Sequence, residues 1–122
     1  MSDERLTFKE MCARFDVTPR TLRYYEYIEL LHPVKEGRSR FFGSRDVARM
    51  TLILRGRRFG FSLEEIRQWL LMREEKGTDE QMKVWVDAAD RQIKALTQER
   101  DELDRTIQEL RELRDVGLSG NN

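Results

Sequence analysis

The residues with the clearest chemistry lie between Val17 and Glu26, where arginines, hydroxyl groups and tyrosines alternate with apolar side chains. Thr18 is a residue type that caps helix N-termini. Pro19 follows at the first helical position, where its fixed φ suits the helix and its missing N–H is not needed. The pattern therefore predicts a helix that begins at Pro19 and ends near Tyr27.

Helical spacing at about 100° per residue divides this segment into two faces. One face collects cationic and hydroxyl-bearing side chains: Arg20, Thr21, Arg23 and Tyr24. The opposite face carries Leu22, Tyr25 and Glu26. Arginine is the commonest specific ligand of guanine edges, and hydroxyl groups donate to phosphates. We therefore predict that one face packs while the other enters the major groove of DNA. A surface pair between Arg23 and Glu26, one turn later, is the alternative for Arg23.

The distribution of charge agrees with an anionic partner for the first half of the chain. The 122 residues include 23 basic and 23 acidic ones, so the formal net charge is zero. Residues 1–61 hold 13 basic and 8 acidic residues, whereas residues 62–122 hold 10 and 15. Ordinary scatter of surface charge is the alternative explanation. Residues 20–58 favour an anionic partner over scatter, because they hold ten basic residues and only four acidic ones.

Several kinds of chemistry are not expected. Cys12 is the single cysteine, which excludes an intramolecular disulfide and predicts a small core residue. His32 has no histidine or cysteine companion, so we expect a structural or exposed imidazole and no metal site. The chain shows no paired histidine and nucleophile and no glycine-rich phosphate loop, so we expect no catalytic residue and no cofactor. Without an apolar run of about 20 residues or a signal-peptide core, a cytoplasmic location with no membrane contact is predicted.

Two short elements surround the predicted groove-binding helix. Residues 7–10 form a capping box, which begins a helix with apolar Phe8, Met11, Cys12 and Phe15. Because only a few residues separate this helix from Thr18, the pair predicts a helix-turn-helix. Residues 31–35 and 40–42 are β-prone and flank the turn-rich residues 36–39, which predicts a small hairpin, or wing.

Two further helices are expected after the wing. Ser44 is predicted to cap the first, which carries Val47, Met50 and Leu54 on one face and ends near Gly60. Residues 62–65 form a second capping box, which begins a helix with Ile66, Trp69 and Leu70 inward. Arg55, Arg57 and Arg58 form a second basic edge between these helices. Arg45 and Arg49 are expected on the solvated surface.

A heptad pattern follows the loop at residues 76–78. Its a and d positions are Met82, Val86, Ala89, Ile93, Leu96, Arg100, Leu103, Ile107, Leu110 and Arg114. The pattern predicts a helix about 50 Å long, which a head of some 75 residues does not cover. A second copy of the chain must therefore cover it. The predicted organisation is a head over residues 1–75, a dimerisation helix over residues 79–116 and a disordered tail over residues 117–122.

The combined motifs resemble the MerR family of bacterial transcription regulators over nearly the whole chain. Four segments stand in the order and spacing of that family: residues 21–26, Leu30-Leu31 with Pro33, residues 40–42 and residues 58–66. The resemblance implies a mainly α fold, in which a winged helix-turn-helix head precedes a long helix that pairs antiparallel with its twin. It also implies a homodimer on a pseudo-palindromic promoter site, which is bent or untwisted for RNA polymerase.

This sequence departs from the family pattern at several points. Glu29 replaces the usual glycine after the second helix, which predicts a positive φ at a non-glycine residue. Arg38-Ser39 replaces the usual Gly-Tyr of the wing. The effector-binding region of larger members and the cysteines of metal and redox sensors are missing, so the resemblance implies no inducer pocket. Residues 49–63 also resemble short members that control branched-chain amino acid or acyl-CoA breakdown genes.

The predicted site thus has two parts. Base edges and phosphates would be bound by Thr18, Arg20, Thr21, Arg23, Tyr24, Lys35, Arg38, Arg40, Arg57 and Arg58. The heptad positions from Met82 to Leu110 would form the dimer seam. Antiparallel packing of Arg100 against Leu96 of a second copy would add Trp85 and Leu113 at facing g positions. The flanking charges do not settle orientation, so antiparallel pairing rests on the resemblance. Two other functions stay open: a DNA-architectural or recombination accessory protein, and a coiled-coil adaptor whose basic head docks an acidic protein.

Overall fold

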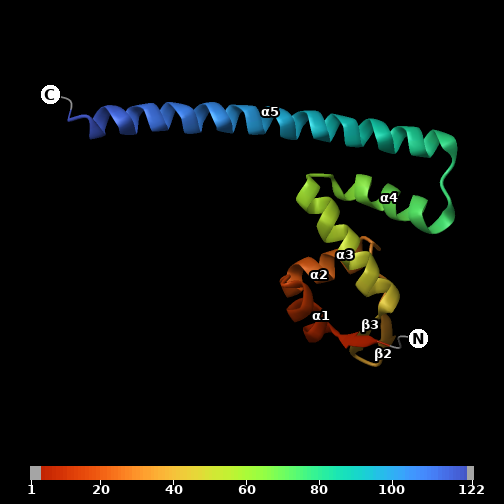
Figure 1. Cartoon of the computed structure of the whole chain (residues 1–122). Helices are drawn as coiled ribbons and strands as arrows, with labels where there is room; N and C mark the ends of the chain where they lie inside the picture. Colours follow the sequence, from red (N-terminus) through yellow and green to blue (C-terminus); the bar gives the residue numbers. More distant parts are fainter. Residues whose placement is uncertain (1–3, 121–122) are drawn as a thin grey trace. The chain divides into compact units, whose positions relative to one another are not determined.

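The computed structural model describes residues 4–120 and divides the chain into two units, Met1–Met82 and Lys83–Asn122. Eight elements follow one another along the chain (Figure 1): β1 Arg5–Thr7, α1 Phe8–Phe15, α2 Pro19–Tyr27, β2 Val34–Glu36, β3 Ser39–Gly43, α3 Ser44–Phe59, α4 Leu63–Glu75 and α5 Asp79–Leu118. The mainly α class with a small winged sheet is confirmed. Within the described part of the chain, no helix is long and apolar enough to cross a membrane.

The helix-turn-helix forms as its caps predict. Thr7 and Glu10 make a reciprocal capping box at the start of α1, and Thr18 caps α2 ahead of Pro19. Between the two helices, Asp16 adopts a left-handed conformation with φ of 53°. Met11 of α1 and Leu22 and Tyr25 of α2 are buried, so the apolar faces of both helices contribute to one core.

The wing is a β-hairpin in a three-stranded sheet of order β1-β3-β2. β2 pairs antiparallel with β3, with Lys35 opposite Arg40 and Glu36 opposite Ser39, and Gly37 turns the chain with φ of 62°. β1 pairs with the other edge of β3 and was not predicted, because three residues carry too little pattern to indicate a strand. Phe42 of β3 is fully buried and ties the sheet to the core.

The junction of α3 and α4 depends on glycines and a cap. The prediction that Ser44 caps α3 is wrong: Gly43 is the cap residue, with no side-chain hydrogen bond, and Ser44 is the first helical residue. The end at Gly60 and the capping box of Ser62 with Glu65 are confirmed. Gly56 allows α3 to approach α4, since a Cβ there would lie 2.7 Å from Cγ1 of Ile66.

The prediction that Arg49 lies on the solvated surface is wrong, because its side chain is only 7% exposed. Nε donates to the carbonyl oxygen of Leu30 at 2.8 Å, and Nη1 pairs with Oε2 of Glu74. Arg45 is exposed as expected, yet it donates to Oε1 of the same carboxylate at 2.8 Å. A buried cation needs such partners. The cluster therefore joins α3, α4 and the segment after α2.

A Glu74→Gln substitution is expected to lower the free energy of unfolding by about 2 kcal/mol at neutral pH, because it removes charged hydrogen bonds. Burial alone would raise the pKa of Glu74, but hydrogen bonds from Arg45 and Arg49 lower it below the ordinary 4.5. A carboxyl whose pKa is lowered by folding stabilises the folded protein at pH values above its ordinary pKa. That stabilisation is lost as the pH falls through the pKa of the folded state. Urea unfolding from pH 7 downward should show the two proteins converging in acid. A gap that does not change with pH would contradict this role, and Glu75→Gln on the same turn serves as the control.

The predicted positive φ at Glu29 is confirmed at 63°. This conformation costs a non-glycine residue about 1–2 kcal/mol. Glycine removes the strain but adds freedom to the unfolded chain, so Glu29→Gly should raise the free energy of unfolding by about 1 kcal/mol. Urea titration at fixed protein concentration measures the change. Glu29→Gln removes the charge and keeps the strain; an equal gain in both variants would show that charge, not φ, is responsible.

The long C-terminal helix is confirmed, and it runs without a break from Asp79 to Leu118. Thr78 accepts from the backbone N–H of Gln81 at 3.1 Å, and Gln81 Oε1 accepts from that of Thr78 at 2.8 Å, which caps its start. Forty residues correspond to a rod about 60 Å long. The tail predicted for residues 117–122 differs: residues 117 and 118 are helical, and residues 121 and 122 lie outside the described residues.

Candidate nucleic-acid interface

The two predicted faces of α2 are confirmed. Leu22 and Tyr25 are buried, whereas Arg20, Arg23 and Tyr24 are exposed. Packing by the apolar face therefore turns the arginines toward solvent. The structure does not have the alternative pair of Arg23 with Glu26. The guanidinium of Arg23 instead lies 5.5 Å from the ring centre of Phe8.

The two threonines at the start of α2 are not equivalent. Thr18 Oγ1 accepts from the N–H of Thr21 at 3.1 Å, and the hydroxyl oxygens of the two threonines lie 3.0 Å apart. Either hydroxyl group can donate in that second bond. Thr18 thus caps α2, whereas Thr21 lies within the first turn of the helix.

A groove of about 610 Å³ lies along the exposed face of α2. It is lined by Arg20, Thr21, Arg23, Tyr24, Tyr25, Tyr27, Arg57 and Leu63. The described residues that line it include three arginines and no acid. Arg57 reaches it from the last turn of α3, where its Nη1 donates to the carbonyl oxygen of Phe61 at 3.3 Å. Such a concave cationic surface attracts an anion.

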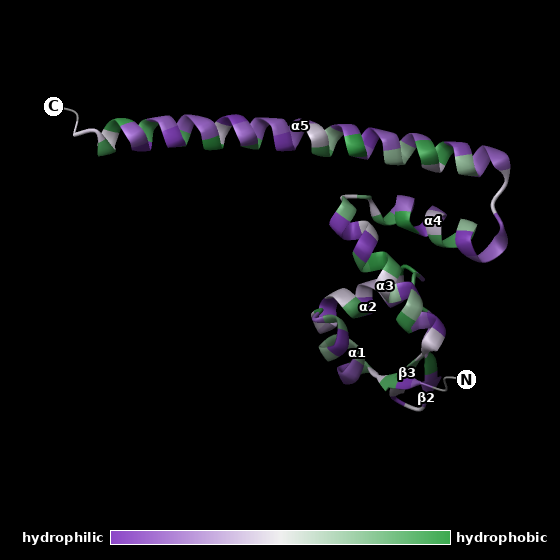
Figure 2. Cartoon of the chain, viewed as in Figure 1, coloured by the Kyte–Doolittle hydropathy of each residue, from purple (hydrophilic) through white to green (hydrophobic). Residues whose placement is uncertain are grey.

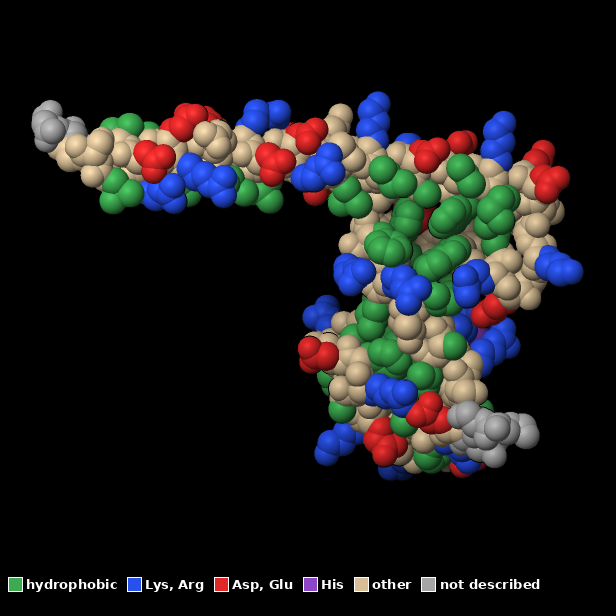
Figure 3. Space-filling model, in the orientation of Figure 1, with side chains coloured by type: hydrophobic (Ala, Val, Ile, Leu, Met, Phe, Trp, Pro, Cys, Tyr) green, Lys and Arg blue, Asp and Glu red, His purple; other side chains and the backbone are tan. Residues whose placement is uncertain are grey.

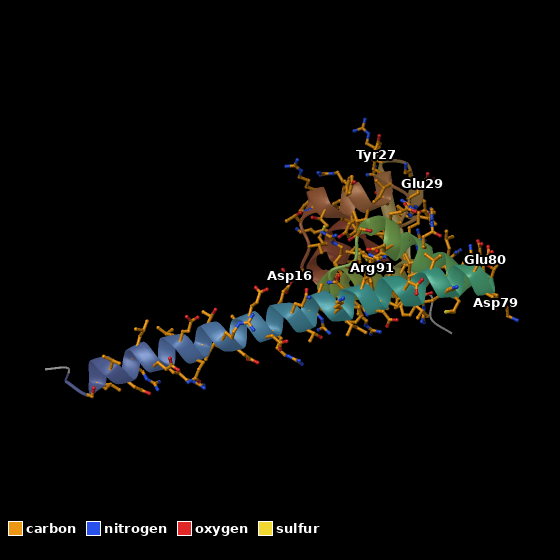
Figure 4. All side chains as sticks on the ribbon, turned by 90° about the horizontal axis from the view of Figure 1, so that it is seen from above. Asp16, Tyr27, Glu29, Asp79, Glu80 and Arg91 are labelled. Atoms are coloured by element: carbon orange, nitrogen blue, oxygen red, sulfur yellow. The ribbon has the colours of Figure 1, made fainter. Side chains whose placement is uncertain are left out.

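Tyr27 was missed by the sequence analysis, although its position could have been found. It lies seven residues after Arg20 and three after Tyr24, which is the same helical face. Its side chain is 82% exposed, and Figure 4 shows it at the outer edge of the first unit. A largely exposed tyrosine beside arginines offers a hydroxyl donor for phosphate.

The wing cations are less free than predicted. Arg40 Nε lies 2.8 Å from Oε1 of Glu26 and donates a hydrogen bond to Oε2 at 3.1 Å, while Lys35 Nζ lies 3.5 Å from Oε2. Arg38, at the tip of the hairpin, is exposed and has no acidic partner in the part of the chain that the structure describes. Of the three cations predicted to contact DNA from the wing, Lys35 and Arg40 would have to leave Glu26 to bind a phosphate, whereas Arg38 would not.

The second basic edge is divided. Arg57 lines the groove along α2, but Arg58 lines a separate hollow of about 330 Å³ with Leu54 and Arg55. The two arginines are adjacent in sequence and therefore point about 100° apart around α3. A single DNA segment held along α2 would lie next to Arg57.

The described residues give no sign of a metal centre or a reactive thiol. Residues 4–120 contain no group of three or more His, Cys, Asp or Glu that could hold a metal ion. Cys12 is half-buried, and burial raises the pKa of its thiol, an effect that the charge of Arg23 opposes. His32 is exposed and anchored through its backbone N–H, which Asp46 Oδ1 accepts at 3.0 Å. Cys12 is thus less buried than predicted, and of the two alternatives predicted for the His32 imidazole the structure has the exposed one.

The heptad side chains form an exposed apolar stripe on α5. From its middle to its end the stripe is between 40% and 69% exposed: Ile93, Leu96, Leu103, Ile107, Leu110 and Leu113. Hydrophobic residues recur among hydrophilic ones along the whole helix (Figure 2), and they show on its surface in Figure 3. Arg100 stands within the stripe, with Nη2 3.7 Å from Oδ1 of the adjacent Asp101. An exposed stripe of this kind marks an interaction surface.

Comparison with known proteins agrees with this arrangement. A family model described as "MerR, DNA binding" matches residues 47–115, and one described as "MerR HTH family regulatory protein" matches residues 6–72. The chain is similar to the HTH-type transcriptional regulator HmrR of Rhizobium leguminosarum bv. viciae. The two are 36% identical over 107 residues, which cover 86% of this chain and 75% of that protein.

Two solved structures have the same fold. A MerR-family transcriptional regulator from Bacillus cereus matches with a TM-score of 0.70 and 27% identity, over 89% of this chain and 79% of that one. HiNmlR, a MerR-family regulator that lacks the sensor domain and is bound to promoter DNA, matches with a TM-score of 0.64 over 85% and 79%. At 20% identity, the second likeness shows the fold alone.

Proposed function

The chain belongs to the MerR family of DNA-binding transcriptional regulators, and we propose that it acts as a homodimer that binds a pseudo-palindromic promoter site and bends or untwists it. The observation that carries the proposal is the groove along α2, where Arg20, Arg23 and Arg57 gather with no acidic residue among the described residues that line it. Phosphate binding supplies affinity without sequence preference, and contacts to base edges add that preference.

The contacts divide by position. Arg20, Thr21 and Arg23 contact base edges from α2, because their side chains lie on the exposed half of the helix. Tyr24 and Tyr27 contact the sugar-phosphate backbone of the DNA. Arg38 at the wing tip and Arg57 at the end of α3 bind phosphates on either side of the groove, which fixes the register of α2 on the duplex.

The α5 stripe provides the dimer. A second copy, paired antiparallel, buries the exposed leucines and isoleucines, with Arg100 facing Leu96 of the second copy. Two heads on one stiff rod have a fixed separation, so the dimer requires a half-site spacing as well as a sequence. If the half-site spacing differs from the separation of the heads, binding bends or untwists the promoter at the cost of DNA deformation energy. RNA polymerase would be the partner of the dimer at that promoter.

The test is selection of bound duplexes from a random pool, followed by footprinting on the selected site within the genome. The proposal predicts two inverted half-sites at one spacing, one dimer per site, and a footprint between promoter elements. Circularly permuted fragments should show bending through altered mobility. Recovery of unrelated duplexes, or sites confined to recombination loci, would contradict regulation at promoters.

A further inference from the structure

Glu26 stands at an unusual place for a carboxylate, between α2 and the wing of a DNA-binding head. Its side chain is 14% exposed. It lines a hollow of about 500 Å³ with Arg23, Tyr27, Lys35 and Arg40, beside the groove described above. Glu26 is the only acid among the described residues of this lining, and it shares the hollow with cations of α2, β2 and β3.

The register of the hairpin explains why both wing cations reach it. Lys35 and Arg40 are direct partners across β2 and β3, so their side chains stand on the same face of the sheet. Like charges in directly opposite positions repel each other. The Glu26 carboxylate contacts both cations, at 3.5 Å and 2.8 Å, and so offsets this repulsion.

The same contacts limit what the wing offers to DNA. Two cations and one anion leave a net charge of one in the cluster. For Arg40 to move to a phosphate, Glu26 would lose its closest cation while most of its side chain stays out of water, and an unpaired buried charge is costly. Arg38 faces no such competition.

We propose that Glu26 sequesters Lys35 and Arg40 from DNA phosphates and thereby lowers the affinity of the protein for non-operator DNA. This inference rests on the proposed binding of DNA by α2 and the wing. Sequence preference still comes from the base contacts of α2, whereas the wing charge governs the binding that is independent of sequence. Glu26 is thus a positioning residue, which acts through the two cations and does not itself touch DNA.

The test measures binding of the full chain to a duplex of random sequence between 50 and 200 mM salt. Neutralising Glu26 in Glu26→Gln frees about one additional cation. The slope of log K against log salt should steepen by about 0.9, and the affinity near 150 mM salt should rise roughly fivefold. A role in holding the wing alone predicts the opposite, an unchanged slope with equal or weaker binding, and that result would overturn the inference.

Two variants complete the design. Glu29→Gln makes the same change in charge just beyond the same helix without releasing an ion-paired cation, so it should shift the slope by less than half as much. Glu26→Gln with Arg40→Gln removes the closest pair together and leaves only the exposed Lys35 without its carboxylate, so it keeps the fold even if the single variant does not. This double variant should keep the wild-type slope, whereas a slope shallower by about 0.9 would mean that Arg40 already binds phosphate. If the unsubstituted chain bound no duplex, the proposed function would fail. If it bound duplexes but Glu26→Gln left the slope unchanged, only the role of Glu26 would fail.

Discussion

Arg20→Ala is expected to remove base preference at one position of each half-site, while the protein stays folded and dimeric. Arg20 is exposed at the start of α2, lines the cationic groove and has no acidic partner among the described residues. A bidentate arginine contact discriminates between bases by about 1–3 kcal/mol, which corresponds to roughly 5- to 150-fold. Selection from a random pool with both proteins, followed by competition binding on single-base variants, measures the loss.

Arg38→Ala is the matched control, because it removes the same side chain from the wing tip. It should weaken binding to all sequences alike and reduce the salt slope by about 0.9, with base preference intact. If Arg20→Ala kept the full preference, or if both variants weakened all sequences equally, α2 would not be the element that contacts bases.

The helix-turn-helix was predictable because its signals are local. Thr18 and Pro19 fix the start of α2 within a single residue, and the apolar positions Leu22 and Tyr25 decide which face packs. Once that face is buried, the orientation of Arg20 and Arg23 follows from helical geometry alone. The long α5 was predictable for the same reason, since a heptad sustained over many turns allows little else.

The wrong predictions for Arg49 and for the wing cations concern side chains whose partners are distant in sequence. Arg49 shows no sign of burial in its own helix; its partners Leu30 and Glu74 lie 19 and 25 residues away. Glu26 lies 14 residues from Arg40, so the sequence assigned Arg40 to phosphate without an internal competitor. Charge patterning counts ions, but only tertiary structure shows which of them are already paired. The exposed cations along α2 were thus predictable, whereas the pairing of the wing cations was not.

Glu29 illustrates a third case, in which the sequence predicts strain that the structure retains. Its positive φ follows from the chain reversal after α2, where the N–H of Leu30 bonds the carbonyl of Tyr25 at 2.9 Å. Burial of Leu30 and Leu31 immediately afterwards holds that reversal in place. The backbone therefore accepts an unfavourable residue because the core fixes its conformation.

Leu103→Asp is expected to separate the dimer and, with it, to abolish binding to a two-half-site duplex. Leu103 is a d residue of the α5 stripe and faces Ile93 of the second copy in the proposed register. Burial of one leucine contributes about 1.5–3 kcal/mol, and a dimer loses two of them, which weakens association by roughly 10²- to 10⁴-fold before the cost of burying a carboxylate is added. Sedimentation equilibrium measures association, and mobility shift measures binding to whole sites and single half-sites.

Gln98→Asp is the control, because it makes the same change in charge at an f position, away from the stripe. It should leave the dimer intact and bind the whole site normally. The Leu103→Asp protomer should keep the weak affinity of one head for a single half-site, since α2 and its groove belong to the other unit. A Leu103→Asp protein that sediments as a dimer would contradict the proposed seam. A wild-type chain that binds whole sites and single half-sites equally would contradict the coupling of the two heads through α5.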